Sequence, residues 1–177
     1  MTGHVPSTEE LANRSAIQET IFSHCRGLDR ADEALLKSCY WEDATVDYGF
    51  FKGDAHAFCE LIIPAIQRYR ATHHQVSNLL VARKGSNAVV ETYLTAYHHQ
   101  PDGAKREMSY FGRYVDHFQR RGGCWKIFFR QVVADWNQNW ASTDDLDSGT
   151  LSALSKSARM PEDPIYSLKM KIIGPSQ

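Results

Sequence analysis

The sequence predicts an α+β fold, a cone-shaped α+β barrel in which N-terminal helices pack across the open mouth of a strongly curved antiparallel sheet. Three observations predict it. Apolar residues recur at helical spacing only as far as about residue 70. Four segments rich in β-branched and aromatic residues follow, and turn-forming residues separate them. The length of 177 residues fits one domain with a tail.

The first helix is predicted from its start signal. Ser7 and Glu10 fit the S/T-x-x-E capping box, in which each side chain binds the main chain of the other residue. Apolar residues then recur at helical spacing through Leu28. Gly27 weakens the last turn, so we expect the helix to end near Asp29 or Arg30.

Two more helices and a short strand are expected before the main sheet. The second helix is predicted over about residues 32–41 and the strand over residues 46–51. Asp54 is expected to cap a third helix that runs to about residue 70. Pro64 lies inside that pattern and predicts a kink or break, because proline lacks the N–H that a helix interior needs.

Four long strands are predicted in the second half of the chain, over residues 73–83, 88–99, 106–120 and 124–137. Short turn-forming segments separate them, at residues 84–87, 100–103 and 121–123. Strands joined by such short turns form an antiparallel meander. A sheet that carries helices on one face only must bend sharply, and this bend creates a cone-shaped cavity.

The domain is expected to cover residues 1–140, followed by a C-terminal tail over residues 141–177. The composition turns polar from Ala141, and a weak helical segment is predicted over residues 151–158. We expect the tail to cover the pocket or to lie at an interface with another subunit.

The charge balance narrows the class of partner. The chain has 20 basic and 21 acidic side chains and a formal net charge of -1, which argues against nucleic-acid binding. No apolar run approaches the roughly 20 residues of a membrane-spanning helix, and the first residues lack a signal-peptide pattern. The four cysteines are scattered without a CxxC pair, which is typical of reduced thiols. We therefore expect a cytoplasmic protein with no nucleic-acid or membrane partner.

Two histidine pairs, His73-His74 and His98-His99, suggest a metal site. Adjacent side chains in a strand point to opposite faces, so neither pair can chelate one ion. A site that combines His74 with His98 or His99 across strands stays open, but no carboxylate spacing supports it. We predict no metal and no cofactor.

His74 is the first candidate for chemistry. Regular alternation would place it on one largely apolar strand face, together with Val76, Asn78, Leu80 and Ala82. A histidine on such a face is either a structural core residue or a base. As a base it needs a carboxylate to orient its ring, which Asp29 can supply.

Arg130 is the candidate counter-charge for an anion that develops during a reaction. Alternation places it with Phe128, Val132 and Ala134 on one face of the last strand. A charge on this aromatic and aliphatic face is costly unless it is paired or functional. The alternative interpretations are an edge residue and an ion-pair partner of an acidic neighbour.

Four sequence runs resemble a known family: residues 17–29, 40–44, 74–78 and 123–130. In order and spacing they look like the SnoaL-like branch of the NTF2-like superfamily. The nearest pattern is that of scytalone dehydratase, hexachlorocyclohexane dehydrochlorinase and bile-acid dehydratase. The resemblance covers roughly residues 8–140, so that segment is expected to be a catalytic domain of this type.

The resemblance implies a deep apolar pocket with a His-Asp dyad, which maps onto His74 and Asp29. His74 is preferred to its rival His73 because it stands four residues before Asn78, as in the family's His-x-x-x-Asn pattern. The arginine that assists the leaving group maps onto Arg130.

At His24 the sequence departs from the pattern, because relatives carry Lys or Tyr there as a helper acid. His24 and Asp29 are five residues apart and diverge by about 140° on a straight helix. Both can face the pocket only if the helix distorts near Gly27.

The resemblance and the dyad together predict a cofactor-independent lyase. His74 would remove a C–H proton, Asp29 would hold the ring, and Arg130, with His24, would stabilise the departing group. The reaction is a dehydratase-type elimination or an aldehyde-releasing C–C cleavage. A steroid-type isomerase is a further alternative. A non-catalytic small subunit of a ring-hydroxylating dioxygenase and a small-molecule binding module are the alternatives outside catalysis.

The substrate is expected to be a hydrophobic aromatic or polycyclic hydroxylated molecule, since apolar pockets with few polar groups suit such ligands. Six aromatic residues are candidates for the pocket wall: Tyr48, Trp41, Tyr110, Tyr114, Phe128 and Trp136. The resemblance also implies a homo-oligomer, with a trimer favoured and a dimer possible.

Overall fold

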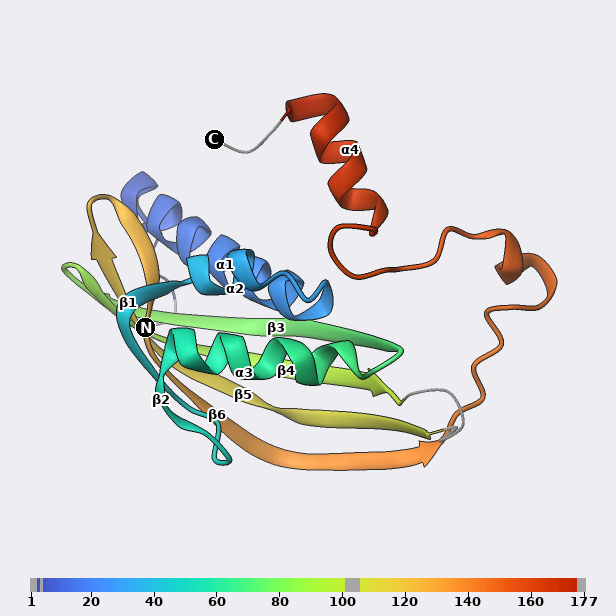
Figure 1. Cartoon of the computed structure of the whole chain (residues 1–177). Coiled ribbons are helices and arrows are strands. Elements are labelled where there is room, and N and C mark those ends of the chain that lie inside the picture. Colours follow the sequence, from blue (N-terminus) through green and yellow to red (C-terminus); the bar gives the residue numbers. More distant parts are fainter. Residues whose placement is uncertain (1–2, 4, 101–105, 175–177) are drawn as a thin grey trace.

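The computed structural model describes residues 3, 5–100 and 106–174 and places three helices against one side of a curved six-stranded sheet (Figure 1). The main core lies between these helices and the sheet. The predicted α+β class, with N-terminal helices across a curved sheet, is confirmed. The sheet is not closed, because β2 and β3 remain as its two edges.

Helix α1 (Thr8–Asp29) begins and ends where the sequence predicts. Both hydrogen bonds of the capping box are present: the Glu10 N–H donates to the Ser7 hydroxyl at 3.2 Å, and the Ser7 N–H donates to the Glu10 carboxylate at 2.7 Å. The helix continues through Gly27. A Cβ atom there would lie 3.0 Å from Leu36, so glycine allows the close approach of the next helix.

Helix α2 (Glu33–Ser38) is shorter than predicted, and strand β1 (Tyr40–Asp47) begins earlier. The predicted helix over residues 32–41 and strand over residues 46–51 were therefore wrong in their bounds. Tyr40, Ala44 and Val46 are buried, and their burial on the core side explains the strand.

Helix α3 (Ala55–Gln67) follows the short strand β2 (Lys52–Asp54) and is capped by the Asp54 carboxylate, as predicted. Pro64 lies inside this uninterrupted helix, so the predicted break is absent. Proline removes one main-chain donor, and the helix tolerates that cost because Phe58, Ile63 and Ile66 are buried against the core.

The meander of four long strands is confirmed. It consists of β3 (Ala71–Lys84), β4 (Asn87–His99), β5 (Arg106–Arg121) and β6 (Cys124–Ala141), paired in sequence order and antiparallel. The predicted turn at residues 100–103 falls largely outside the described residues. The full strand order is β2-β1-β6-β5-β4-β3, and β1 pairs with β6 in parallel, so the sheet is mixed rather than wholly antiparallel.

A β-bulge in β3 changes which residues face the helices. The pairing register with β4 shifts between Ser77 and Leu79, and Asn78 at the bulge has φ +35°. His74 and Val76 lie on the inner side, as predicted. Beyond the bulge Leu79 packs on the core and Leu80 is 55% exposed, so the prediction that Leu80 and Ala82 share the His74 face was wrong.

A bulge in β6, at Phe128, also changes which residues face the helices. His117 pairs with Phe129 but Phe118 pairs with Ile127, which leaves Phe128 as the extra residue. Its ring contacts His117 and the guanidinium of Arg121, whereas Arg130 is fully buried. The prediction that Phe128 shares the face of Arg130 was therefore wrong.

The chain after β6 leaves the sheet and swings outward before it returns beside the end of α1 (Figure 1). It forms a 3-10 turn (Gly149–Ala153) in place of the predicted weak helix over residues 151–158, and then the unpredicted helix α4 (Pro164–Ile173). Within the described ranges, no helix is long and apolar enough to cross a bilayer.

Candidate functional site

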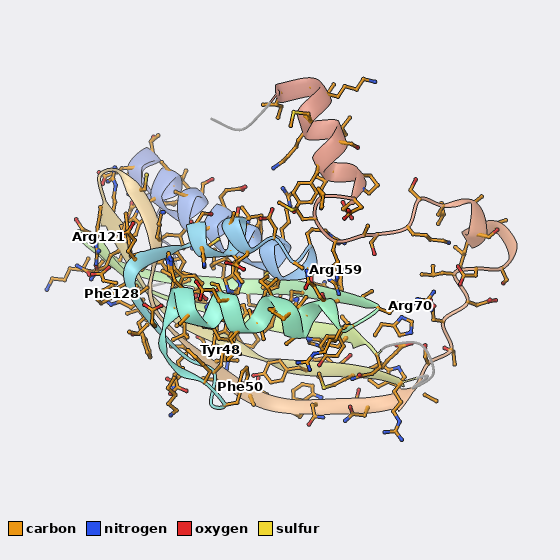
Figure 2. All side chains as sticks on the ribbon, viewed as in Figure 1. Tyr48, Phe50, Arg70, Arg121, Phe128 and Arg159 are labelled. Atoms are coloured by element: carbon orange, nitrogen blue, oxygen red, sulfur yellow. The ribbon has the colours of Figure 1, made fainter. Side chains whose placement is uncertain are left out.

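A cavity of about 720 Å³ lies between α3, the end of α1 and the inner face of the sheet. Most of its wall is apolar, and the polar side chains on it are few. The polar side chains on it are His74, His98, Tyr48, Tyr110, Tyr114 and Arg68. Figure 2 labels Tyr48 and Phe50, which reach one side of the cavity from the connection between β1 and β2.

The cavity wall includes His74, which is hydrogen-bonded to Asp29. The ring Nδ1 lies 2.7 Å from Asp29 Oδ1, and the His74 main-chain N–H donates to Oδ2 at 2.9 Å. The two side chains are only 6% and 9% exposed. Both carboxylate oxygens thus bind one residue, which fixes the ring and leaves Nε2 as the nitrogen available to a ligand.

Asp29 is ionised in this environment. Burial alone would raise the pKa of its carboxyl, but hydrogen bonds from His74 and Thr72 and the charge of His74 outweigh burial and lower it below 3.8. An ionised Asp29 beside Nδ1 favours the tautomer that carries its proton on Nδ1.

His98 is a second imidazole on the cavity wall, and its ring meets that of His74 edge to face with 5.6 Å between centroids. Burial, with the charge of His74, lowers the pKa of His98 to about 4, so its ring is neutral at pH 7. The sequence pattern indicated His98 only as a candidate metal ligand. The signal that it missed is the pairing of β3 with β4, which sets His74 opposite Ala96, two residues from His98.

Arg130 lies behind the cavity wall. Its guanidinium is fully buried and makes two hydrogen bonds to Asp116, Nε to Oδ1 at 2.8 Å and Nη2 to Oδ2 at 2.7 Å. It also lies 3.7 Å from the ring centroid of Tyr114, which does line the cavity. The interpretation of Arg130 as an ion-pair partner is confirmed, and Asp116, directly opposite it on β5, was missed.

His24 points into the core. It is fully buried, its Nε2 lies 2.9 Å from the Tyr40 hydroxyl, and its ring packs edge to face on Tyr40 and Tyr114. Burial, with the charge of Arg130, holds the pKa of His24 well below its ordinary range, so the ring is neutral. His24 therefore packs against a wall residue from behind and is separated from the cavity.

Three of the six predicted aromatic residues line the cavity: Tyr48, Tyr110 and Tyr114. The hydroxyls of Tyr48 and Tyr110 are buried, and neither has a hydrogen-bond partner within the described part of the chain. Burial raises the pKa of the Tyr48 hydroxyl, and the nearby charge of Arg130 opposes this effect. The rings of these residues thus line the cavity, while their hydroxyl oxygens are buried in its wall.

The other three lie elsewhere, which corrects their predicted position on the pocket wall. Trp41 contacts Arg121 and Lys126 beside a separate depression, and its indole donates to the Gln119 carbonyl. Figure 2 shows Phe128 beside Arg121. Trp136 is 57% exposed and stacks on Phe111.

His73, the rival of His74, is exposed and packs near Tyr97. In the ranges that the structure describes, no group of three or more His, Cys, Asp or Glu side chains is arranged to hold a metal ion.

Comparison with known proteins identifies the family. Residues 9–131 match the family described as the SnoaL-like domain. The chain belongs to this SnoaL-like family. The end of β6 and the tail that follows it, including α4, lie outside the matched segment. A search of curated proteins finds no match to the sequence of this SnoaL-like protein.

Solved structures resemble this SnoaL-like protein in fold. A candidate scytalone dehydratase from Novosphingobium aromaticivorans is 22% identical over 75% of this chain and 93% of that one, with a TM-score of 0.68. A type 2 hexachlorocyclohexane dehydrochlorinase is 19% identical over 76% and 93%, with a TM-score of 0.68. The β subunit of a candidate aromatic-ring-hydroxylating dioxygenase, also from N. aromaticivorans, is 17% identical over 71% and 91%, with a TM-score of 0.59.

Proposed function

We propose that this SnoaL-like protein is a cofactor-independent lyase whose base is His74. The observation that carries the proposal is the hydrogen-bonded pair of His74 and Asp29 on the wall of a largely apolar cavity. A histidine held by a carboxylate, with its other nitrogen available to a ligand, is the arrangement of a general base.

In the proposed elimination, His74 Nε2 takes a proton from a substrate C–H group. The C–H electron pair forms the new C=C bond, and the neighbouring C–O bond breaks. Asp29 stabilises the imidazolium that forms. The departing hydroxide takes up the proton held on His74 Nε2 and leaves as water, which restores the neutral imidazole. Tyr48 and Tyr110 form part of the wall against which the substrate packs.

Arg130 has an indirect part in this proposal. Its guanidinium lies behind Tyr114 and close to Tyr48 and is paired with Asp116, so only the part of its charge that Asp116 does not cancel favours negative charge on that side of the cavity. The neutral imidazole of His24 packs on the Tyr114 ring from the side of the core.

The cavity favours a hydrophobic substrate. Its volume of about 720 Å³ falls in the range of small-molecule sites, and its wall is mostly aliphatic and aromatic. An aromatic or polycyclic molecule with at least one hydroxyl group matches this wall and the few polar groups on it. We place the protein in the cytoplasm as part of the same proposal.

The same base also suits two related reactions. Retro-aldol cleavage would release an aldehyde if the substrate carries a hydroxymethyl group. An isomerase would return the abstracted proton to another carbon. Product analysis separates the three reactions, because water, an aldehyde or no second product is released.

A non-catalytic role is the second candidate, and the likeness in fold to a dioxygenase β subunit favours it. A purely structural subunit has no requirement for a base beside a cavity. The His74–Asp29 pair therefore supports the enzyme over the subunit or a simple binding module.

The deciding experiment compares His74→Ala with wild type on a panel of hydroxylated aromatic and steroid compounds. We expect turnover to fall by roughly 10²- to 10⁴-fold, the usual contribution of a general base. His73→Ala is the matched control, since that neighbour is exposed on the other face, and it should keep wild-type turnover. Unchanged turnover in His74→Ala would refute the proposed base.

A further inference from the structure

Arg159 of the C-terminal tail reaches into the junction where α1, α3 and β3 meet (Figure 2). Its Nη1 donates to the Asp29 carbonyl at 2.6 Å and to the Thr72 hydroxyl at 3.1 Å. Its Nη2 donates to the carbonyls of Ile66 at 3.0 Å and Tyr69 at 3.1 Å. One guanidinium thus joins the ends of two helices to the start of a strand.

Two of these acceptors, the carbonyls of Asp29 and Ile66, lie at helix ends, and the Ile66 carbonyl also accepts from the Tyr69 N–H at 3.1 Å. The last carbonyls of a helix have no partner within it, and Asp29 and Ile66 both lie in the last turn of their helices. Asp29 is also a carboxylate at the negative end of α1, which the helix dipole disfavours. A cation at this end offsets that cost, and Arg159 supplies one.

The same guanidinium reaches the dyad through two contacts outside the carboxylate itself. It binds the main chain of Asp29 directly. It also binds Thr72, whose hydroxyl helps to lower the pKa of Asp29 by hydrogen bonding to its carboxylate. Thr72 stands two residues before His74 on β3, so Arg159 links the strand that carries the base to the helix that carries its partner.

We propose that Arg159 is a positioning residue that sets Asp29 against His74, and that the tail is thereby a part of the active site. The inference rests on the proposed function for its catalytic meaning. Arg159 does not line the cavity in the described structure, so its effect passes through Asp29. The matched family segment ends at residue 131, so this contact is an addition to it.

The tail has other anchors on the domain, and they provide a control. The Met160 N–H donates to the Arg30 carbonyl at 2.6 Å, and Arg30 binds Ala158 and Asp163. The Tyr166 hydroxyl donates to Asp32 at 2.8 Å. Tyr166→Phe therefore removes one contact between tail and domain without touching Asp29.

The test measures the dyad in the whole protein without substrate. Proton–nitrogen NMR at a temperature well below unfolding follows the His74 Nδ1–H signal and the exchange of the His74 main-chain amide, which donates to Asp29 Oδ2. In Arg159→Ala we expect the ring signal to broaden or disappear and amide exchange to accelerate about tenfold or more, because the acceptor is no longer held. Tyr166→Phe should match wild type.

Arg159→Lys keeps the charge but loses the planar set of donors, so it should fall between wild type and Arg159→Ala. This variant decides the question if Arg159→Ala does not fold. An unchanged His74 signal and exchange rate in Arg159→Lys and Arg159→Ala, or an equal loss in Tyr166→Phe, would overturn the proposal.

The effect of Arg159 on catalysis is measured by the kinetics of any compound that wild type converts. Arg159→Ala should lower kcat by roughly 10- to 100-fold with little change in KM, because misplacement of a catalytic group affects the reaction more than ligand contact. A changed KM with unchanged kcat would contradict positioning. If wild type converts no compound, the proposed function fails, while the NMR result still decides the role of Arg159 in the dyad.

Discussion

Asp29 gives both of its carboxylate oxygens to His74, one to the ring and one to the main chain. This double contact specifies the ring orientation and the tautomer together. It also makes the ionised carboxyl part of the folded structure, because the hydrogen bonds that lower its pKa exist only in the folded chain. The orientation of the His74 ring and the acid stability of the fold therefore depend on the same side chain.

Asp29→Asn is expected to reduce the dependence of the unfolding free energy on acid pH. The pKa of Asp29 is lower in the folded chain than its ordinary value of 3.8, so its ionisation stabilises the fold fully above that value. This stabilisation is lost as the pH falls through the folded-state pKa. Urea unfolding from about pH 6 to pH 2 measures it.

The difference in unfolding free energy between wild type and Asp29→Asn should be largest near neutral pH and shrink in acid. A difference of constant size over that range would show that Asp29 does not titrate as described.

Residue types predicted the pair of His74 and Asp29 but not the residues that hold the site in place, such as Arg159 and Asp116. His74 and Asp29 carry recognisable chemistry and family spacing, so sequence analysis selected them. Arg159 binds three main-chain carbonyls, and every residue type offers a carbonyl, so no sequence pattern marks its partners. Asp116 could be found only from the register of β5 against β6.

The bulge at Asn78 determines which side of β3 faces the helices. An extra residue there lets His74 face the cavity while Leu79 still packs on the core. Asn78 adopts a positive φ, which asparagine and glycine accept more readily than other residues. Alternation of apolar residues predicts the inner face only where the strand is regular, so sequence analysis failed beyond this point.

Asn78→Val should lower the unfolding free energy by about 1–3 kcal/mol, because a β-branched residue is strained at positive φ. Asn78→Gly is the matched control and should stay within about 1 kcal/mol of wild type, since glycine adopts this conformation freely. Urea unfolding measures both. Equal stabilities for the Val and Gly variants would mean that the backbone at residue 78 does not require its positive φ.

At the scale of the whole molecule, the strand meander could be predicted from the sequence, but the pairing of β1 with β6 could not. The meander follows from short turns between neighbouring segments. The parallel pairing of β1 with β6 joins residues about 85 positions apart, Tyr40 with Ile127 for example, and no local signal encodes it. The strand order that results leaves β2 and β3 as the two edges, so the sheet does not close.

Large apolar side chains on two strands are exposed, and we propose that a second subunit covers them. They are 39–58% exposed and belong to β4 and β6: Val89, Tyr93, Tyr97, Trp136 and Trp140. A homotrimer through this surface fits the expected oligomer, although a dimer would bury it as well.

Sedimentation equilibrium should therefore give a mass near three times 20.1 kDa for wild type. Trp136→Arg places a charge in the exposed apolar surface and should shift the mass toward the monomer. Leu11→Arg, an exposed apolar position on α1, is the control and should leave the mass unchanged. A monomeric wild type would rule out this assembly, and a mass of two chains would replace the trimer by a dimer.

The outward course of residues 143–157 makes Arg159 a tethered ligand of its own domain. This stretch is exposed, and Arg159 binds beyond it. While the chain is intact, the guanidinium meets its site at an effective concentration on the order of millimolar, whatever the dilution of the protein. A single protease cut in the stretch would leave every residue present, yet occupancy of the site would then depend on concentration. After limited proteolysis, the fragment that carries Arg159 would therefore dissociate from Asp29 when the protein is diluted.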